Sequence, residues 1–392
     1  MSLLTDLAAQ IAGLDAAALR RTRRQLDSAQ GVSVTVDGQP WLSFCSNDYL
    51  GLAAHPDLAR AAREGLEKYG TGAGASHLLT GHTGAHHRLE QALATFTGQP
   101  AALLFSTGYM ANLGVVSALV GRGDAVFADR LNHACLNDAA LLSRAAFRRY
   151  PHGDLAALER QLERSDARRR LIAVDGVFSM DGDIAPLPEL LALAERFDAW
   201  LLVDDAHGFG VLGNGQGSLA HFGLDPVRTR ERVIYMGTLG KAAGVFGAFV
   251  AGAPELIETL IQKARTYVFT TALPPMIASA LTASLHLIEW EPARRAQLAA
   301  VIARWREGVR GLRSGHPLDS ITAIQPWIVG DAPRALAMSA ALAERGLLVP
   351  AIRPPTVPAG TARLRVSLSA AHSLADVDRL CLAMHAMDGS FQ

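Results

Sequence analysis

The chain has 392 residues, of which 49% are hydrophobic and 19% are charged. This balance excludes a disordered chain, and the length predicts one large and one smaller globular domain. Lys plus Arg and Asp plus Glu both number 37, so the net charge gives no reason to expect a nucleic acid or an anionic membrane as partner.

The first part of the chain predicts a basic helix over Leu14 to Leu26 and then a strand-like segment over residues 32–44, with Asp37-Gly38 as its turn. From Pro56 onward, helical patterns alternate with short, almost wholly apolar runs. These runs cover 102–106, 125–129, 171–176, 200–205, 232–237 and 247–252. Apolar runs of strand length between helix-length segments predict an α/β fold with a mostly parallel, buried sheet.

Past Pro274-Pro275, the pattern changes to long helical stretches rich in Ala, Leu and Arg, with strand candidates near 325–329 and 363–369. This change predicts a smaller C-terminal α+β domain. We expect an N-terminal helix and strand segment over 1–52, a large α/β domain over 53–284 and a C-terminal domain over 285–392.

The remaining features predict no disulfide framework, no membrane anchor and no metal site. The three cysteines, Cys45, Cys135 and Cys381, are too few and too scattered for a disulfide framework or a zinc cluster, which favours reduced thiols in the cytoplasm. The N-terminal residues do not resemble a signal peptide, and the uncharged stretch 91–121 is interrupted by Gly, Pro and Asn, so we expect no membrane anchor. Thirteen histidines occur, but none has the HExxH spacing, and we expect no metal.

Polar residues follow the predicted strands at the points where they end. In an open parallel sheet, ligands bind at the carboxyl ends of the strands, so these residues are expected to meet in one site. In chain order they are Ser106 to Tyr109, His133, Ser179, Asp204 to His207 and Thr238 to Lys241.

Lys241 stands in the Gly- and Ala-rich sequence TLGKAAG, and only three of the 37 basic residues are lysines. Burial of this amine would lower its pKa, and a neutral amine is required to form an imine with a carbonyl compound. A lysine on an exposed loop is the alternative, and the local sequence alone leaves both interpretations open.

Asp204 and His207 fit the same chemistry in the sequence DDAHGFG. An acidic residue at a strand end can simply cap the next turn. It can also keep the ring nitrogen of a pyridoxal-phosphate (PLP) cofactor protonated, so that the ring accepts electrons from the substrate. His207 could then bond the ring oxygen, and His133 could stack on the ring or simply pack.

The turn at Gly108 precedes an apolar helix, and the free N–H groups of a helix N-terminus can bind a phosphate. The turn lacks the GxxxxGK[ST] pattern of nucleotide-binding loops. No GxGxxG opens a first βαβ unit, which argues against NAD.

Together these residues resemble the aspartate-aminotransferase superfamily of PLP enzymes (fold type I), and within it the α-oxoamine synthases. The resemblance extends from about residue 14 to the C-terminus. It rests on the motifs SNDYLGL (46–52), GAGASHLLTGHTGAHHRLE (72–90), DGVFSMDGD (175–183), DDAHGFG (204–210) and TLGK (238–241). The segment 351–372 favours the members that condense L-alanine with a pimeloyl thioester in biotin biosynthesis. One departure is visible, because Ala242-Ala243 follow the lysine where the family usually has Gly, and we expect only slightly altered packing from it.

The resemblance implies a role in cofactor binding for each matching residue. Lys241 would hold PLP as a Schiff base, Asp204 would pair with the ring nitrogen, His133 would stack on the ring, and His207 would bond its phenolic oxygen. The remaining cofactor contacts would be Gly108, Tyr109, Ser179 and Thr238. Thr270 and Thr271 would reach the phosphate from the neighbouring subunit, which implies a homodimer with shared sites.

The resemblance also implies how substrate is bound. Arg365 would clamp the amino-acid carboxylate with help from Asn47, and Arg21, Thr356 and His133 would also contact substrate.

The implied reaction is a decarboxylative Claisen condensation in which Lys241 moves the α-proton and His133 or His207 assists decarboxylation. The acyl group could arrive as pimeloyl-CoA or pimeloyl-acyl carrier protein. Two alternatives stay open: another α-oxoamine synthase that uses glycine and a different acyl-CoA, and a non-catalytic partner subunit of such an enzyme.

Overall fold

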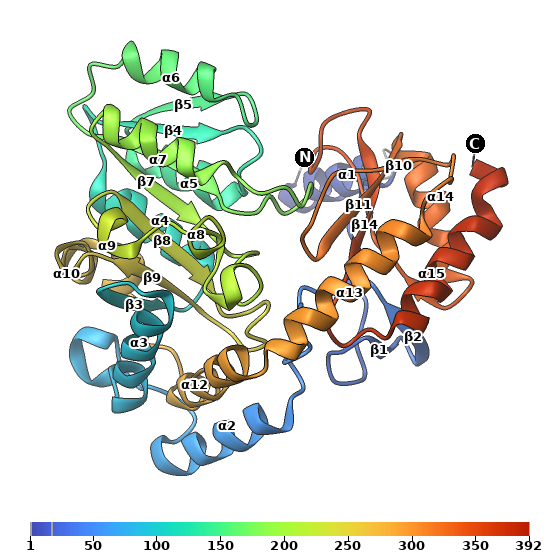
Figure 1. Cartoon of the computed structure of the whole chain (residues 1–392), viewed down its shortest axis with the longest axis horizontal. Coiled ribbons are helices and arrows are strands. Elements are labelled where there is room, and N and C mark those ends of the chain that lie inside the picture. Colours follow the sequence, from blue (N-terminus) through green and yellow to red (C-terminus); the bar gives the residue numbers. More distant parts are fainter. Residues whose placement is uncertain (1, 17–18, 392) are drawn as a thin grey trace.

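The computed structural model describes residues 2–16 and 19–391. Figure 1 shows two lobes, one built on a large sheet and the other on a smaller sheet with α13, α14 and α15 beside it. Within the described residues, no helix is long and apolar enough to cross a membrane.

The N-terminal helix is displaced from its predicted position. Helix α1 spans Leu3–Ala16, so the predicted helix over 14–26 is confirmed over 14–16 and wrong over 19–26, which is not helical. Residues 17 and 18 lie outside the described part. The physical reason is the run of arginines over residues 20–24, because like charges three and four residues apart repel one another on a helix.

The predicted hairpin is confirmed. Strands β1 (Ser33–Val36) and β2 (Gln39–Ser43) pair antiparallel, with Val36 opposite Gln39. Asp37 and Gly38 have φ values of 50° and 72°, as a two-residue hairpin turn of the mirror-image type requires.

The large sheet confirms the predicted mostly parallel architecture. Its order is β3-β9-β8-β7-β6-β4-β5, in which β5, β4, β6, β7 and β8 are parallel and β9 runs antiparallel to both β8 and β3. The strands are β3 (Ala101–Phe105), β4 (Ala125–Asp129), β5 (Ala146–Tyr150), β6 (Arg170–Asp175), β7 (Ala199–Asp204), β8 (Val233–Thr238) and β9 (Ala248–Gly252). Strand β5 was not predicted, because it is an edge strand with two arginines in the sequence AFRRY.

Helices cover both faces of this sheet, which explains why its strands are apolar on both sides. One face packs against α4 (Gly108–Leu119), α5 (Ala134–Ser143), α10 (Pro254–Lys263) and α11 (Arg265–Val268). The other packs against α3 (Gly84–Thr97), α6 (Leu155–Glu163), α7 (Leu187–Arg196) and α12 (Pro275–Trp290). The large lobe also contains α2 (Pro56–Tyr69), a π-turn at His77–Gly81, a 3-10 turn at Gly213–Gly215, α8 (Ser218–His221) and α9 (Pro226–Thr229).

The C-terminal part has its own antiparallel sheet in the order β10-β11-β14-β13. The strands predicted near 325–329 and 363–369 are confirmed as β11 (Ile324–Gly330) and β14 (Ala362–Ser367). The other elements are α13 (Pro292–Gly308), β10 (His316–Pro317), α14 (Ala332–Ala343), β12 (Leu347–Leu348), β13 (Ala351–Ile352), α15 (Leu374–Met387) and a 3-10 turn at Asp388–Phe391.

The N-terminal hairpin is joined to this C-terminal part. Strand β12 pairs with β2 in parallel, with Leu347 opposite Leu42. Helices α12 and α13 run between the two lobes (Figure 1). The domain boundaries at residues 53 and 285 stay predictions, and the second of them would fall within α12.

Candidate active site

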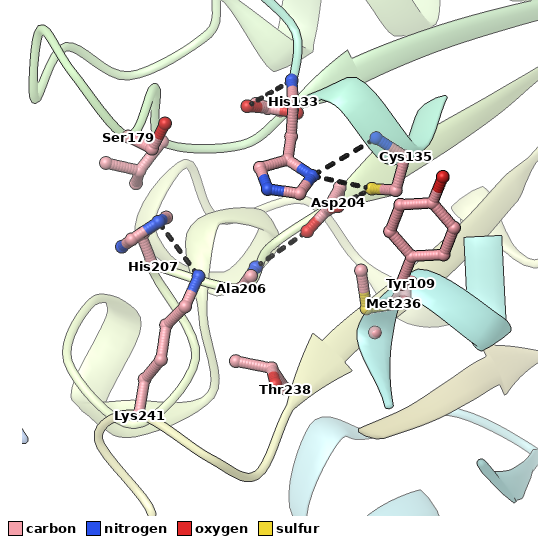
Figure 2. Close-up of a pocket in the computed structure, with 13 residues that line it drawn as sticks. Tyr109, His133, Cys135, Ser179, Asp204, Ala206, His207, Met236, Thr238 and Lys241 are labelled. Carbon is pink, nitrogen blue, oxygen red and sulfur yellow. Dashed lines mark hydrogen bonds between the residues drawn. The ribbon is translucent and has the colours of Figure 1, made fainter. Parts of the chain in front are cut away.

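A cavity of about 190 Å³ opens at the carboxyl ends of the parallel strands, where the sequence predicts the site. Figure 2 shows that side chains from strand ends far apart in the sequence point into it. The predicted residues that line it are Gly108, Tyr109, His133, Ser179, Asp204, His207, Thr238 and Lys241. Cys135, Asp175, Val177, Ala206 and Met236 also line it and were not predicted.

Lys241 lies in the turn after β8 and reaches the cavity from below in Figure 2. Its Nζ is 2.9 Å from Nε2 of His207. Burial lowers the pKa of Lys241 from 10.5 to about 8, although the nearby Asp204 carboxylate opposes this shift. The neutral fraction of this amine near neutral pH is therefore much larger than that of a free lysine, which favours the imine-forming interpretation of Lys241 over an exposed loop lysine.

Asp204 ends β7 and its carboxylate is held from two sides. Oδ2 accepts a hydrogen bond of 2.6 Å from the side-chain amide of Asn112, and Oδ1 accepts one of 3.1 Å from the backbone N–H of Ala206. The Asn112 amide also lies 3.1 Å from Sγ of Cys135. Asn112 is fully buried on α4, and a polar residue within that apolar helix was a signal that sequence reasoning missed.

His133 is the N-cap of α5 and is fixed by two neighbours. Its backbone N–H donates to both oxygens of Asp175 at 3.1 and 3.0 Å, and its Nδ1 accepts from the backbone N–H of Cys135 at 3.2 Å. Asp175 is buried at the end of β6, and burial followed by the nearby Asp204 charge raises its pKa well above 3.8. The imidazole of His133 therefore has one orientation at the cavity wall (Figure 2).

A chain of hydrogen bonds runs from Lys241 through His207 to the N-terminal segment. The Tyr49 hydroxyl donates to Oδ1 of Asn47 at 3.1 Å and lies 2.6 Å from Nδ1 of His207. The two ring nitrogens of His207 thus face Tyr49 on one side and Lys241 on the other, and the tautomer of the imidazole sets which of these groups donates. Burial, and then the positive charge of Lys241, lowers the pKa of His207 well below 6.5, so this imidazole is neutral.

Arg365 lies on β14 in the smaller sheet, directly behind the cavity wall. Its Nε donates to the backbone carbonyl of Ser179 at 2.7 Å, and both Nη atoms lie 3.3 Å from Oδ1 of Asn47. It is only 6% exposed, and in the described part of the chain its hydrogen bonds go to neutral acceptors and no carboxylate lies within 4.0 Å. A buried guanidinium without a carboxylate partner is suited to bind an anionic group.

Of the predicted substrate-binding residues only His133 lines this cavity, and the predicted partner-facing threonines do not line it either. Arg21 is exposed in the segment after α1, and Thr356 is exposed in the loop before β14. Thr270 and Thr271 lie in the loop between α11 and α12, where Thr271 is exposed. The structure therefore does not bring these residues to the site of the same chain, and their roles stay predictions.

The cavity has the features that PLP requires of a binding site. An amine with a lowered pKa faces it from one side and a buried carboxylate from another. The first turn of α4 also opens onto it at Gly108, where Thr107 caps the helix by accepting from the N–H of Met110 at 3.1 Å. The free N–H groups of that turn are suited to a phosphate, so the residues present fit the cofactor.

Comparison with known proteins first defines the class. The family model described as "Aminotransferase class I and II" matches residues 39–384. A variant of serine palmitoyltransferase from S. paucimobilis, solved with bound PLP, superimposes with a TM-score of 0.92. It is 31% identical, and the match covers 100% of this chain and 99% of that one. The chain is thus a PLP-dependent enzyme of fold type I, and the predicted fold and class are confirmed.

Curated relatives define the group within that class. The 8-amino-7-oxononanoate synthase of Herminiimonas arsenicoxydans is 61% identical over 97% of this chain and 98% of the relative. The 8-amino-7-oxononanoate synthase of Nitrosospira multiformis is 62% identical over 94% of this chain and 92% of the relative. The chain belongs to the 8-amino-7-oxononanoate synthase family of acyltransferases.

Proposed function

We propose that this chain catalyses the PLP-dependent condensation of L-alanine with a pimeloyl thioester, in biotin biosynthesis. Alanine and the thioester combine to 8-amino-7-oxononanoate, CO₂ leaves from the alanine carboxyl group, and the thiol of CoA or of an acyl carrier protein is released. The observation that carries the proposal is the buried Arg365, whose charge has no carboxylate partner among the described residues, directly behind the cavity that Lys241 and Asp204 line.

Lys241, Asp204 and the α4 N-terminus would hold the cofactor in this proposal. PLP, when bound, draws electrons from the α-carbon of an amino acid through its protonated ring. Asp204 keeps the proton on the ring nitrogen, and Asn112 and the Ala206 N–H hold its carboxylate in place for this task. Gly108, Tyr109, Ser179 and Thr238 would complete the cofactor contacts, and His133 would cover the ring.

The amino-acid substrate is oriented by charge. Its carboxylate binds the guanidinium of Arg365, and Asn47, which contacts both Nη atoms, fixes the plane of that group. Lys241 Nζ then removes the α-proton, which its lowered pKa permits near neutral pH. His207 is neutral and its Nε2 already faces Nζ at 2.9 Å, so it can hold the amine in position.

We include a homodimer with shared sites in the proposal. Helix α1 has no buried residue, although Leu4, Leu7 and Ile11 make part of it apolar. Phe269, beside Thr270, is 72% exposed. Apolar surface of this kind is suited to a second copy of the chain, whose Thr270 and Thr271 would reach the phosphate. The three cysteines are unpaired, as a cytoplasmic location would require.

Substrate choice tests the proposal directly. The purified protein is offered alanine, glycine or serine with pimeloyl-CoA, acetyl-CoA, succinyl-CoA or palmitoyl-CoA, and thiol release and the amino-ketone product are measured. We expect alanine with pimeloyl-CoA to be the preferred pair, by about 10- to 100-fold in kcat/KM over glycine, since one methyl group is worth that much in a fitted pocket. A preference for glycine and a short acyl group would instead identify another α-oxoamine synthase.

Lys241→Ala tests whether the chain is catalytic at all. We expect this variant to fold, to lose the absorbance band of lysine-bound PLP, and to lose turnover by at least about 10³-fold. Full retained turnover would contradict the proposal, and a wild-type protein without the band or thiol release would point to a non-catalytic subunit. Kinetics with pimeloyl-CoA and pimeloyl-acyl carrier protein would then identify the preferred donor.

A further inference from the structure

A second group of side chains lies outside the cavity, where the π-turn at His77–Gly81 meets the start of α3. His82, His87 and Glu90 each place one ligand atom within 4.8 Å of the others. Nε2 of His82 is 3.8 Å from a carboxylate oxygen of Glu90, and the rings of His82 and His87 are 6.1 Å apart. His87 and Glu90 are three residues apart on α3, which places them on the same side of the helix.

Two of the three side chains are already held by neighbours that leave one atom facing the group. Nδ1 of His82 is 3.1 Å from Nδ1 of His77, and one oxygen of Glu90 accepts a 3.0 Å hydrogen bond from the backbone N–H of Leu104. When His82 donates a hydrogen bond from Nδ1, the lone pair of its Nε2 faces the second carboxylate oxygen of Glu90. Such outer contacts orient metal ligands in proteins.

Glu90 has few partners for its carboxyl group at this position. The side chain of Glu90 is only 12% exposed, and its one ion-pair partner within 4 Å, among the described residues, is His82. Nε2 of His82 therefore faces a carboxylate oxygen of Glu90 at 3.8 Å, with a ligand atom of His87 close to both, and such a group of nitrogen and oxygen atoms is suited to a divalent cation.

We propose that His82, His87 and Glu90 form a binding site for a divalent transition metal, with zinc as the best match. Two imidazoles and one carboxylate are a ligand set that zinc accepts, with water in the fourth position beside the exposed His87. Zinc bonds of about 2.0–2.1 Å place tetrahedral ligands about 3.3 Å apart, so the present separations of up to 4.8 Å must contract by up to about 1.5 Å. His87 is exposed and contacts only Gln91 at 3.0 Å on its helix, so its rotation can supply most of that change. His86 is not a ligand, because both of its ring nitrogens are engaged by Thr83 and by the carbonyl of Leu273.

A metal bound at this site would connect the residue after the π-turn to α3. Its binding can be measured without any assay of turnover. The untagged, PLP-loaded protein is treated with a chelator and titrated with Zn²⁺ by calorimetry and with Co²⁺ by visible absorption. We expect one equivalent per chain, and at least about a tenfold weaker affinity in His87→Gln and in Glu90→Gln. His316→Gln, an exposed histidine on β10, is the matched control and should bind as the wild type does.

Thermal melting gives an independent measurement. Zinc should raise the melting temperature of the wild type and of His316→Gln, and should leave that of His87→Gln unchanged, because only a ligand bound to the folded state stabilises it. His87 is exposed, so this variant is expected to fold even if Glu90→Gln does not. No saturable binding up to 100-fold excess of metal, or an equal loss of affinity in the His316 control, would overturn the proposal.

Discussion

Lys241 must be neutral to react, whereas a lysine in water is charged. An amine must be neutral to attack a carbonyl or to take a proton, yet a free lysine is almost fully protonated at neutral pH. Burial in the cavity, beside the neutral imidazole of His207, shifts this balance by making the charged form less stable. The amine can then react without another side chain first removing its proton.

This shift predicts how PLP uptake depends on pH. Below pH 8 the Lys241 amine is mostly protonated, so the rate at which cofactor-free protein takes up PLP should rise with pH and level off above about 8. The rate is measured by the growth of absorbance after rapid mixing with PLP, and Lys241→Ala serves as the control without a reactive amine. A rate that keeps rising to pH 10 would mean that the lysine is solvated.

Arg365 and Arg363 provide a matched pair on one strand. Arg363 donates to the carboxylate of Asp181 and to the carbonyl of Met180, whereas Arg365 has only neutral acceptors among the described residues. The first arginine is thus satisfied within the fold, and the second retains its charge for a ligand. The two arginines are two residues apart on β14, so their side chains leave the same face of the strand but contact different neighbours.

We therefore expect Arg365→Lys to raise the KM for alanine by about 10- to 100-fold, because a lysine cannot form the two parallel bonds to a carboxylate. The absorbance of bound PLP should stay unchanged. Arg363→Lys should lower the melting temperature and leave the KM for alanine within about twofold. Equal effects of the two variants on KM would assign Arg365 a structural role.

Among the elements, the loop between β6 and α7 depends on a histidine from another strand end. Ring nitrogens of His152, which follows β5, lie 3.1 Å from Asp129 at the end of β4 and 3.0 Å from Asp183 in that loop. Donation to both carboxylates requires the protonated ring, and these bonds raise the pKa of His152 to about 10. The same loop carries Ser179, whose carbonyl accepts from Arg365, so His152 steadies one wall of the cavity.

The raised pKa predicts a pH-dependent contribution to stability. The stabilisation by His152 is fully present below the unfolded pKa of about 6.5 and is lost as the pH rises toward about 10. His152→Gln should therefore lower the free energy of unfolding by about 1–2 kcal/mol at pH 6, a modest amount because 32% of the side chain is exposed, and by much less at pH 10. Denaturant unfolding at several pH values measures this, and an effect that grows with pH would contradict it.

At the scale of the whole molecule, the site combines residues from both lobes, and the proposed dimer would add residues of a second subunit. Arg365 and Asn47 come from segments outside the large sheet, and they meet because β14 and the residues after β2 lie together beside the cavity. Thr270 and Thr271 do not line the cavity that Lys241 and Asp204 line in their own chain. In the proposed dimer, the two threonines would reach the phosphate of the cofactor in the neighbouring subunit.

Mixing inactive variants tests whether the sites are shared. Lys241→Ala and a Thr270→Ala/Thr271→Ala double variant are unfolded or dissociated together and reassembled. If each site takes its lysine from one subunit and its threonines from the other, half of the mixed dimers' sites are intact, and about a quarter of the wild-type activity should return. Activity equal to the average of the two separate variants would mean that the sites are not shared, and light scattering independently measures whether the chain is a dimer.

Much of the large sheet could be predicted because its strands are buried on both faces. Complete burial makes a strand a continuous apolar run, and the runs that end at residues 129 and 205 mark β4 and β7 to within a residue. Strand β5 lacked this signal because two arginines, one half-buried and one exposed, interrupt the apolar run at the edge of the sheet. The N-terminal helix was misplaced because periodicity alone takes no account of repulsion among arginines close in sequence.

The sequence by itself determined the strand-end residues of the site, since a parallel sheet brings its carboxyl ends to one edge whatever the loops do. Lys241, Asp204 and His207 were found in this way. Only the tertiary structure decided which side chains support them: Tyr49 for His207 and Asn112 for Asp204 are partners from segments 158 and 92 residues away. The same holds for the unpartnered charge of Arg365 and for the histidine and glutamate group at α3. Hydrogen bonds and burial depend on which atoms lie within about 3 Å, and sequence spacing does not report this for residues brought together by folding.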